Sequence, residues 1–211
     1  MNAIIKESRA LTFEMRADTL ENGIRRISGR PIVYEARTNI GAFDEIIRAG
    51  ALNTADMRDV VLTYNHDLSR IPIARSRRNN GNSTMQLLPD EQGLTMWADA
   101  DTENNAEARA LVSAIERRDI DGMSFIFTIG DEEWEGLETD HPTRIITRID
   151  QIFEVSAVIF PAYDQTTINA RNAETLENAK AALERARAEK PLVRGIDLEL
   201  AKAKYDYLYR R

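Results

Sequence analysis

Cysteine is absent from this sequence of 211 residues, and histidine is scarce, with only His66 and His141. Without cysteine there is no disulfide framework, no thiolate metal site and no cysteine nucleophile. Long hydrophobic runs are missing as well. No stretch approaches the roughly 20 apolar residues that span a bilayer, and the N-terminus lacks the hydrophobic region of a secretion signal. The sequence therefore predicts neither a membrane anchor nor secretion.

An excess of basic residues is also missing. The 28 basic and 35 acidic residues give a formal charge of −7. This balance argues against a direct nucleic-acid binder, because neutralisation of phosphates supplies much of such affinity. One basic segment is an exception, and we interpret it as a solvated loop or a patch for an acidic partner; it contains Arg70, Arg75, Arg77 and Arg78.

Apolar runs and alternating patterns predict strands over most of the first 168 residues. The expected strands lie at 11–17, 30–36, 60–67 and 121–130, with a hairpin over 85–101 and successive strands over 143–150 and 151–162. An acidic loop over 131–142 is expected to separate the strand at 121–130 from those that follow. The fold class is therefore mixed α/β and β-dominated.

Helical patterns are fewer. Residues 42–52 predict a short helix that ends at Gly50. Asn104 or Asn105 can cap a second helix, whose inward stripe is Ala108, Leu111, Val112 and Ile115. After Pro161 the composition changes to Ala, Glu, Arg and Lys, which predicts a solvated or partner-binding helix over 169–190 and a second helix over 198–211. We expect one domain over 1–168 and a helical tail over 169–211.

Histidine is the commonest general base near neutral pH, so the two histidines are the first candidates. His141 lies in Asp140-His141-Pro142 at the end of the acidic loop, which is typical of a solvated turn residue. His66 ends a β-branched strand in Tyr64-Asn65-His66-Asp67. Taken alone, a histidine in this position is more often structural than catalytic.

Two further residues are candidates by their place in strands. Ser124 follows a glycine-containing turn and should face away from Met123 and Phe125; by itself it is more often a serine on a polar face. Glu154 interrupts an apolar run, and a buried carboxylate there needs a partner. That partner could be a histidine Nδ1 or an arginine, and an edge-strand glutamate reaching solvent is an equal alternative. No GxSxG, GxxxxGK[ST], GxGxxG or HExxH motif is present, and no cofactor is expected.

Three segments, in their order, resemble the tailed-phage prohead proteases. They are Asn65-His66-Asp67, Gly122-Met123-Ser124-Phe125, and Glu154-Val155-Ser156 through Pro161-Ala162. Segments upstream match as well, and the resemblance covers roughly residues 1–170. It implies a small β-barrel ringed by helices, as in the related herpesvirus assemblins. It also implies that Ser124 is the nucleophile, His66 the base and Glu154 the orienting residue, with Asp150 as the alternative third member.

The resemblance further implies an endopeptidase of capsid maturation. Such an enzyme acts inside the procapsid in the host cytoplasm, where it cleaves the scaffolding segment of the major capsid protein and itself, and it is compatible with a homo-oligomer. At the point where assemblins carry an arginine segment for the oxyanion, this sequence has Pro161-Ala162-Tyr163, so the oxyanion donors stay unassigned. A non-enzymatic scaffold protein and a hydrolase of another substrate class, both on the same fold, are the alternatives.

Overall fold

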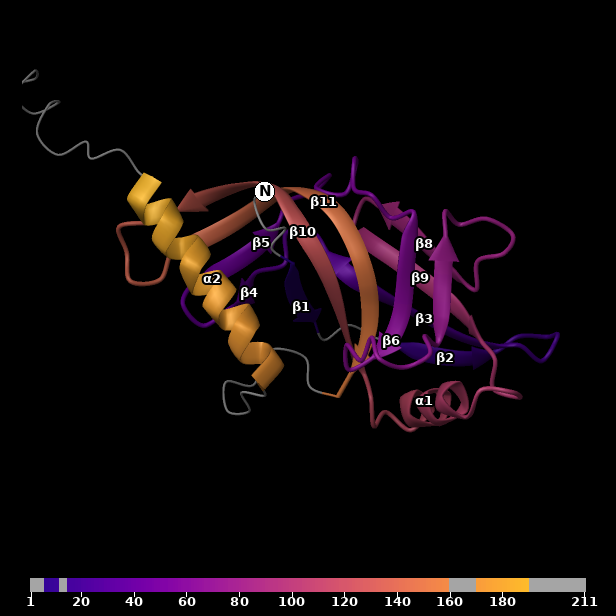
Figure 1. Ribbon diagram of the computed structural model, residues 1–211. Coiled ribbons are helices and arrows are strands. Elements are labelled where there is room, and N and C mark those ends of the chain that lie inside the picture. The colour runs from indigo at the N-terminus through magenta and orange to yellow at the C-terminus, as the bar shows by residue number, and fades with distance from the viewer. Residues whose placement is uncertain (1–5, 12–14, 160–169, 190–211) are drawn as a thin grey trace, which may run out of the picture.

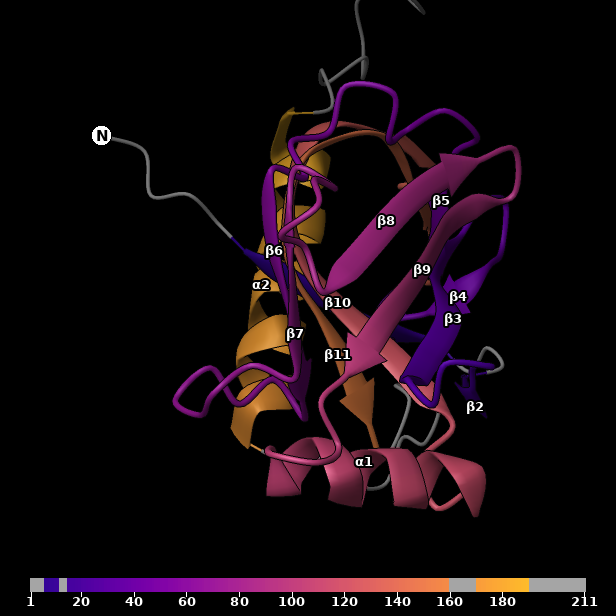
Figure 2. The same ribbon diagram turned by 90° about the vertical axis from the view of Figure 1, so that its right-hand side faces the viewer.

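The computed structural model describes residues 6–11, 15–159 and 170–189. Two sheets make up most of it, and they pack face to face around the apolar core, as Figures 1 and 2 show from two sides. The elements in chain order are β1 (Glu7–Leu11), β2 (Arg16–Thr19), β3 (Arg25–Val33), β4 (Thr38–Asn39), β5 (Asp44–Ile47), β6 (Asp59–Tyr64), β7 (Ala74–Arg77), β8 (Met85–Asp90), β9 (Gly93–Ala100), α1 (Ala106–Glu116), β10 (Gly122–Glu135), β11 (Thr143–Val158) and α2 (Ala170–Glu189).

The larger sheet is built on the long antiparallel pair β10 and β11. β1 adds to the free edge of β10 in antiparallel orientation. Along the other edge of β11, β5 and then β6 pair with it in parallel. β4 extends the sheet beyond β5 and β7 extends it beyond β6. The second sheet has the order β2-β3-β9-β8.

The prediction of a β-dominated mixed fold is confirmed, whereas a closed barrel is not. In the described part of the chain, one backbone-to-backbone hydrogen bond joins the two sheets at each margin, from Glu35 N to Ile47 O (2.9 Å) and from Thr84 N to Arg75 O (3.0 Å). Neither margin continues as a strand ladder. The expected barrel ringed by helices thus stays unconfirmed, and the described helices are α1 and α2 alone.

Helix α1 forms as its sequence pattern predicts. The inward stripe of Ala108, Leu111, Val112 and Ile115 is buried. The cap is Asn105, whose side-chain oxygen accepts the backbone N–H groups of Glu107 (3.0 Å) and Ala108 (3.2 Å). The side chain of Asn104 instead contacts Asp101.

Residues 42–52 were expected as a helix, and this prediction is wrong. Asp44–Ile47 is strand β5, and the inward positions of its alternating pattern, Glu45 and Ile47, are buried. The parallel pairing with Thr143–Ile146 of β11 accounts for the difference, because a long-range partner overrides a local helical pattern.

Two other expectations changed at the β10–β11 hairpin. The acidic segment expected as a loop over 131–142 is in part strand, since β10 continues to Glu135. The strands expected over 143–150 and 151–162 are one continuous strand as far as Val158. The hairpin is therefore longer than its local sequence pattern indicates.

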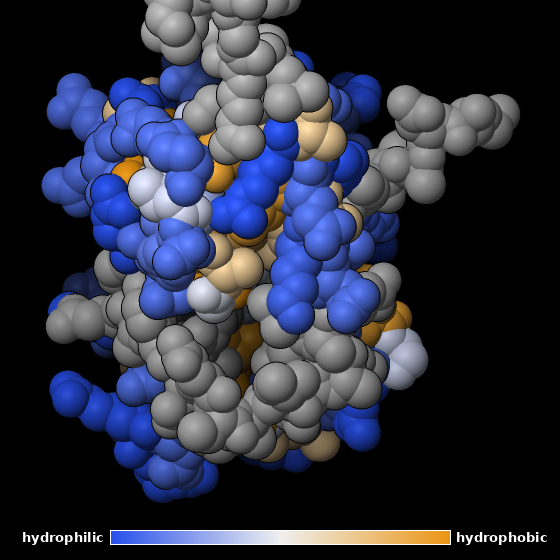
Figure 3. All heavy atoms as spheres, turned by 90° about the vertical axis from the view of Figure 1, so that its left-hand side faces the viewer, coloured by the Kyte–Doolittle hydropathy of each residue, from blue (hydrophilic) through white to orange (hydrophobic). Residues whose placement is uncertain are grey.

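Helix α2 lies against the body of the molecule (Figure 1). Its Ala179 and Leu183 pack on Phe43 in a small cluster of their own, and Arg187 donates to the backbone oxygens of Leu137 (3.2 Å) and Thr139 (2.9 Å). Figure 3 shows a side of the molecule where hydrophilic side chains dominate and a narrow hydrophobic strip lies between them. The domain boundary expected at residues 168 and 169, and the helix expected over 198–211, lie outside the described residues.

The capping contact predicts a difference between two neighbouring asparagines. Asn105→Ala removes the acceptor of two backbone N–H groups and should lower the free energy of unfolding by about 1 kcal/mol. Asn104→Ala, the matched control, should change it by less than half of that. Urea unfolding of both variants measures the difference, and equal losses would contradict the assignment of Asn105 as the cap.

Candidate active site

A row of hydroxyl side chains crosses three neighbouring strands of the larger sheet. Ser124 on β10 faces Ser156 on β11, and Ser156 in turn faces Thr63 on β6. All three residues are buried. The Ser156 and Thr63 hydroxyl oxygens are 3.0 Å apart. The pairing register of β10, β11 and β6 thus brings these polar side chains to one face.

Glu154 lies two residues before Ser156, so its side chain shares that face. It has no solvent exposure. One carboxylate oxygen accepts the hydroxyl of Thr63, and the other lies 2.6 Å from Nδ1 of His66. Both oxygens are thereby paired, which a buried carboxylate requires. Of the partners left open by the sequence, the structure favours the histidine.

His66 is brought over this face by a turn directly after β6. Asn65 and His66 both have left-handed backbone angles, with φ of 49° and 58°. Such angles are uncommon outside glycine, although asparagine and histidine adopt them more readily than most residues. Hydrogen bonds to β11 hold the turn: Asn65 N donates to Ala157 O (2.9 Å), and His66 N donates to the Ser156 hydroxyl (2.9 Å).

Ser124 completes a chain of contacts from Glu154 through the imidazole. Its Oγ lies 2.7 Å from Nε2 of His66. A carboxylate can only accept, so the contact with Glu154 assigns a proton to Nδ1 and leaves Nε2 of the neutral ring as an acceptor. His66 is therefore oriented to take the proton of the Ser124 hydroxyl, which is the geometry of a serine activated by a base.

Strand β1 lies beside this serine in the sheet. Ala10 is paired with Ser124 in the sheet, and the Ser124 hydroxyl donates to the backbone oxygen of Arg9 at 2.7 Å. Ser8 approaches as well, with its Oγ 3.2 Å from Nε2 of His66 and 3.3 Å from Oγ of Ser124. The Ser124 hydroxyl has one hydrogen for two strong acceptors, so the carbonyl of Arg9 competes with the imidazole for it.

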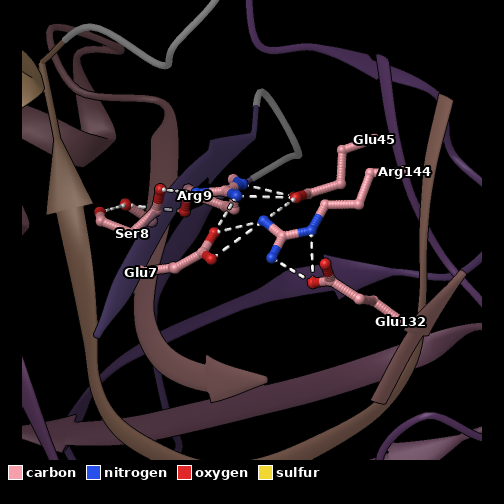
Figure 4. Close-up of polar contacts among 7 residues, drawn as sticks. Glu7, Ser8, Arg9, Glu45, Glu132 and Arg144 are labelled. Carbon is pink, nitrogen blue, oxygen red and sulfur yellow. Dashed lines mark hydrogen bonds and ion pairs between the residues drawn. The ribbon is translucent and has the colours of Figure 1, made fainter. Parts of the chain in front are cut away.

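A buried cluster of charges holds β1 in this place, as Figure 4 shows. Glu45 and Glu7 bind the guanidinium of Arg9, and Glu7 also receives a hydrogen bond from Arg144 (2.9 Å). Arg144 in turn pairs with Glu132. Burial alone would raise the pKa of the Glu7 carboxyl, but Arg9 and Arg144 outweigh it and hold this pKa below its usual value.

Comparison with known proteins identifies the family of the chain. The profile of the family described as caudovirus prohead serine protease matches residues 11–181, which is most of the chain. The chain belongs to this family. Among solved structures, the bacteriophage T4 capsid assembly protease is similar, at 13% identity and a TM-score of 0.35 over 72% of this chain and 98% of that one. No curated protein matches.

The other candidate residues from the sequence make contacts away from Ser124 and Glu154 in this member of the prohead protease family. Asp67 accepts hydrogen bonds from Ser69 and Arg70 in its own turn, and Asp150 pairs with Arg148. His141 contacts Asp44 at 2.9 Å. In the basic segment Arg70 and Arg75 pair with acidic side chains of the same chain. Residues 161–163 lie outside the described part.

Sequence reasoning missed Ser8 as a neighbour of the site and the parts that Thr63 and Ser156 take in holding it. Nothing in the sequence around Ser8 marks it. For Ser156, its position on the face of Glu154 was a usable signal.

In the described part of the chain, no three His, Asp or Glu side chains are grouped so that they could hold a metal ion, and no helix in those ranges is long and apolar enough to cross a membrane.

The ion pairs of Glu7 predict a pH dependence. Because its pKa is lowered by folding, ionised Glu7 stabilises the folded state above about pH 4.5, the ordinary value, and this stabilisation is lost as the pH falls through the lower folded value. The difference in free energy of unfolding between the parent and Glu7→Gln should therefore be large at pH 7 and shrink below pH 4.5. Urea unfolding across this range measures it, in a Ser124→Ala background that keeps the chain intact.

The matched control is Glu91→Gln, because Glu91 is exposed. Its difference from the parent should stay small at every pH. A Glu7→Gln difference that grows on acidification would contradict the ion pairing described for β1.

Proposed function

We propose that this chain is the endopeptidase of prohead maturation, which cleaves the scaffolding segment of the major capsid protein inside the procapsid in the host cytoplasm. One observation carries the proposal. Oγ of Ser124, Nε2 of His66, Nδ1 of His66 and Oε2 of Glu154 follow one another at contacts of 2.7 and 2.6 Å. Membership of the prohead serine protease family supports the class of substrate.

The proposed reaction is acyl transfer. Ser124 Oγ attacks the carbonyl carbon of the scissile peptide while its proton passes to Nε2 of His66. The C–N bond then breaks and the leaving amine takes that proton. Water adds to the acyl-enzyme by the same route, which releases the new carboxylate and restores the serine. Glu154 keeps the imidazole in the reactive tautomer and stabilises its charged form.

The same geometry supports cleavage of the chain by itself, at the bond between Arg9 and Ala10. The Arg9 oxygen lies 2.7 Å from Ser124 Oγ. A carbonyl carbon is about 1.2 Å from its oxygen, so this carbon lies within about 4 Å of the proposed nucleophile. β1 is therefore bound as a substrate strand would be, and it covers the nucleophile until it is cut or displaced.

The substrate is tested by intact-mass analysis of the cognate capsid protein co-expressed with this chain. The wild type should remove an N-terminal segment of the capsid protein, while Ser124→Ala and His66→Ala should leave the protein whole, because each lacks a group that forms the acyl-enzyme. Asp67→Asn is a matched control, since Asp67 adjoins His66 in sequence and contacts Ser69 and Arg70; it should process at a rate within about threefold of wild type.

Equal processing by wild type and Ser124→Ala would remove Ser124 from the mechanism. A capsid protein that assembles with the chain yet stays uncut by every variant would favour the alternative, a non-enzymatic scaffold protein.

Self-cleavage is tested on the purified chain alone. Wild-type protein should lose residues 1–9 and begin at Ala10, with a first-order rate that does not change on dilution, because the bond lies in the same chain as the nucleophile. Ser124→Ala should keep its full mass. Cleavage only at other bonds, or a rate that falls in proportion to concentration, would contradict the proposed position of β1.

A further inference from the structure

The side chain of Arg9 occupies a buried recess lined by carboxylates. Arg9 is 4% exposed and Glu45 is 2% exposed. Both oxygens of Glu45 bind the guanidinium, one at Nε and the other at Nη2 (2.7 Å). A two-point contact of this kind suits the planar fork of arginine. Figure 4 shows the two guanidinium groups of the cluster between the carboxylates.

Most of this recess does not belong to β1. Glu45 lies on β5, Glu132 on β10 and Arg144 on β11. When β1 leaves, these three residues keep one net negative charge. Arg144 retains Glu132, and its contact with Glu45 is long, at 3.5 Å. A buried carboxylate with so weak a partner is costly, so the empty recess would favour an incoming cation.

The strand register connects this recess to the nucleophile. Arg9 is the residue whose carbonyl oxygen meets Ser124, and it is also the residue whose side chain binds Glu45. A substrate that adds to the edge of β10 in the same register would therefore put the residue before its scissile bond beside Glu45. Residues two apart share a face of a strand, so the residue two positions earlier would lie where Glu7 meets Arg144 at 2.9 Å.

We propose that Glu45 selects a basic residue immediately before the cleaved bond, and that Arg144 favours an acidic residue two positions further upstream. The substrates are then extended peptide segments in which an acidic residue, any residue and a basic residue precede the cut, as Glu7-Ser8-Arg9 precedes Ala10. This inference rests on the proposed endopeptidase function and adds its specificity.

The first test needs no change at Glu45. The full-length wild-type chain is incubated with a peptide library made by chymotrypsin digestion of a bacterial lysate, beside Ser124→Ala, and the new termini are identified by mass spectrometry. Arg or Lys should be enriched about tenfold or more before the Ser124-dependent cuts, with Asp or Glu enriched two positions upstream. Ser124-dependent cuts without a basic preference would overturn this inference and leave the protease function standing. Absence of any Ser124-dependent cut would overturn both.

The second test assigns the preference to Glu45. A peptide cut in the first test is compared with its Arg→Gln counterpart. In Glu45→Gln, kcat/KM for the Arg peptide divided by kcat/KM for the Gln peptide should fall about 100-fold, since removing one partner of a buried charge pair has an effect of this order. Asp44→Asn, on the same strand, is the matched control and should keep the wild-type ratio. An unchanged ratio in a folded Glu45→Gln protein would contradict the selection of substrate by Glu45 and would leave the cluster with the role of holding β1 in place.

Discussion

The pairing register of β10 and β11 is the constraint on which the rest of this site depends. It sets Ser124 opposite Ser156 and keeps Glu154 on the same face, while the pairing of β11 with β6 adds Thr63 to the row. Side chains alternate along a strand, so a shift of one residue would turn Ser124 or Glu154 into the apolar interior. The register is secured on the other face, where Met123, Phe125 and Val155 are fully buried.

Strand β1 occupies the proposed site in this structure. Its Arg9 carbonyl accepts the Ser124 hydroxyl, and its charged side chains fill the recess formed by Glu45 and Arg144. The family match begins at residue 11, so most of β1 lies outside it. A buried ion cluster is a poor way to gain stability compared with apolar packing, but it discriminates strongly between occupants. This property suits the proposed role of the recess, in which it holds the chain's own strand first and a substrate afterwards.

Local patterns in the sequence predicted most strands and helix α1 with its buried stripe. The three residues that meet at the site, His66, Ser124 and Glu154, were predicted from the resemblance of their ordered motifs to the prohead proteases, since each residue alone had a structural interpretation. What local patterns could not predict depends on partners distant in sequence. The sequence of β5 has a helical pattern, and its pairing with β11 makes it a strand. The sequence of β1 has no local feature that predicts its contact with Ser124. The packing of α2 on Phe43 could not be predicted either, because the few apolar residues of this helix do not indicate which distant residue they contact.

In the proposed mechanism His66 activates Ser124 and no other hydroxyl. Ser8 is the rival, because its Oγ also lies 3.2 Å from Nε2 of His66. Fluorophosphonate labelling of the wild type and of Ser124→Ala, which keeps residues 1–9 and therefore Ser8, followed by peptide mass mapping, distinguishes the two hydroxyls. A single adduct is expected, on the wild-type peptide that contains Ser124, with none in Ser124→Ala and far slower formation in His66→Ala. An adduct on Ser8, or labelling of Ser124 at the same rate without His66, would contradict this mechanism.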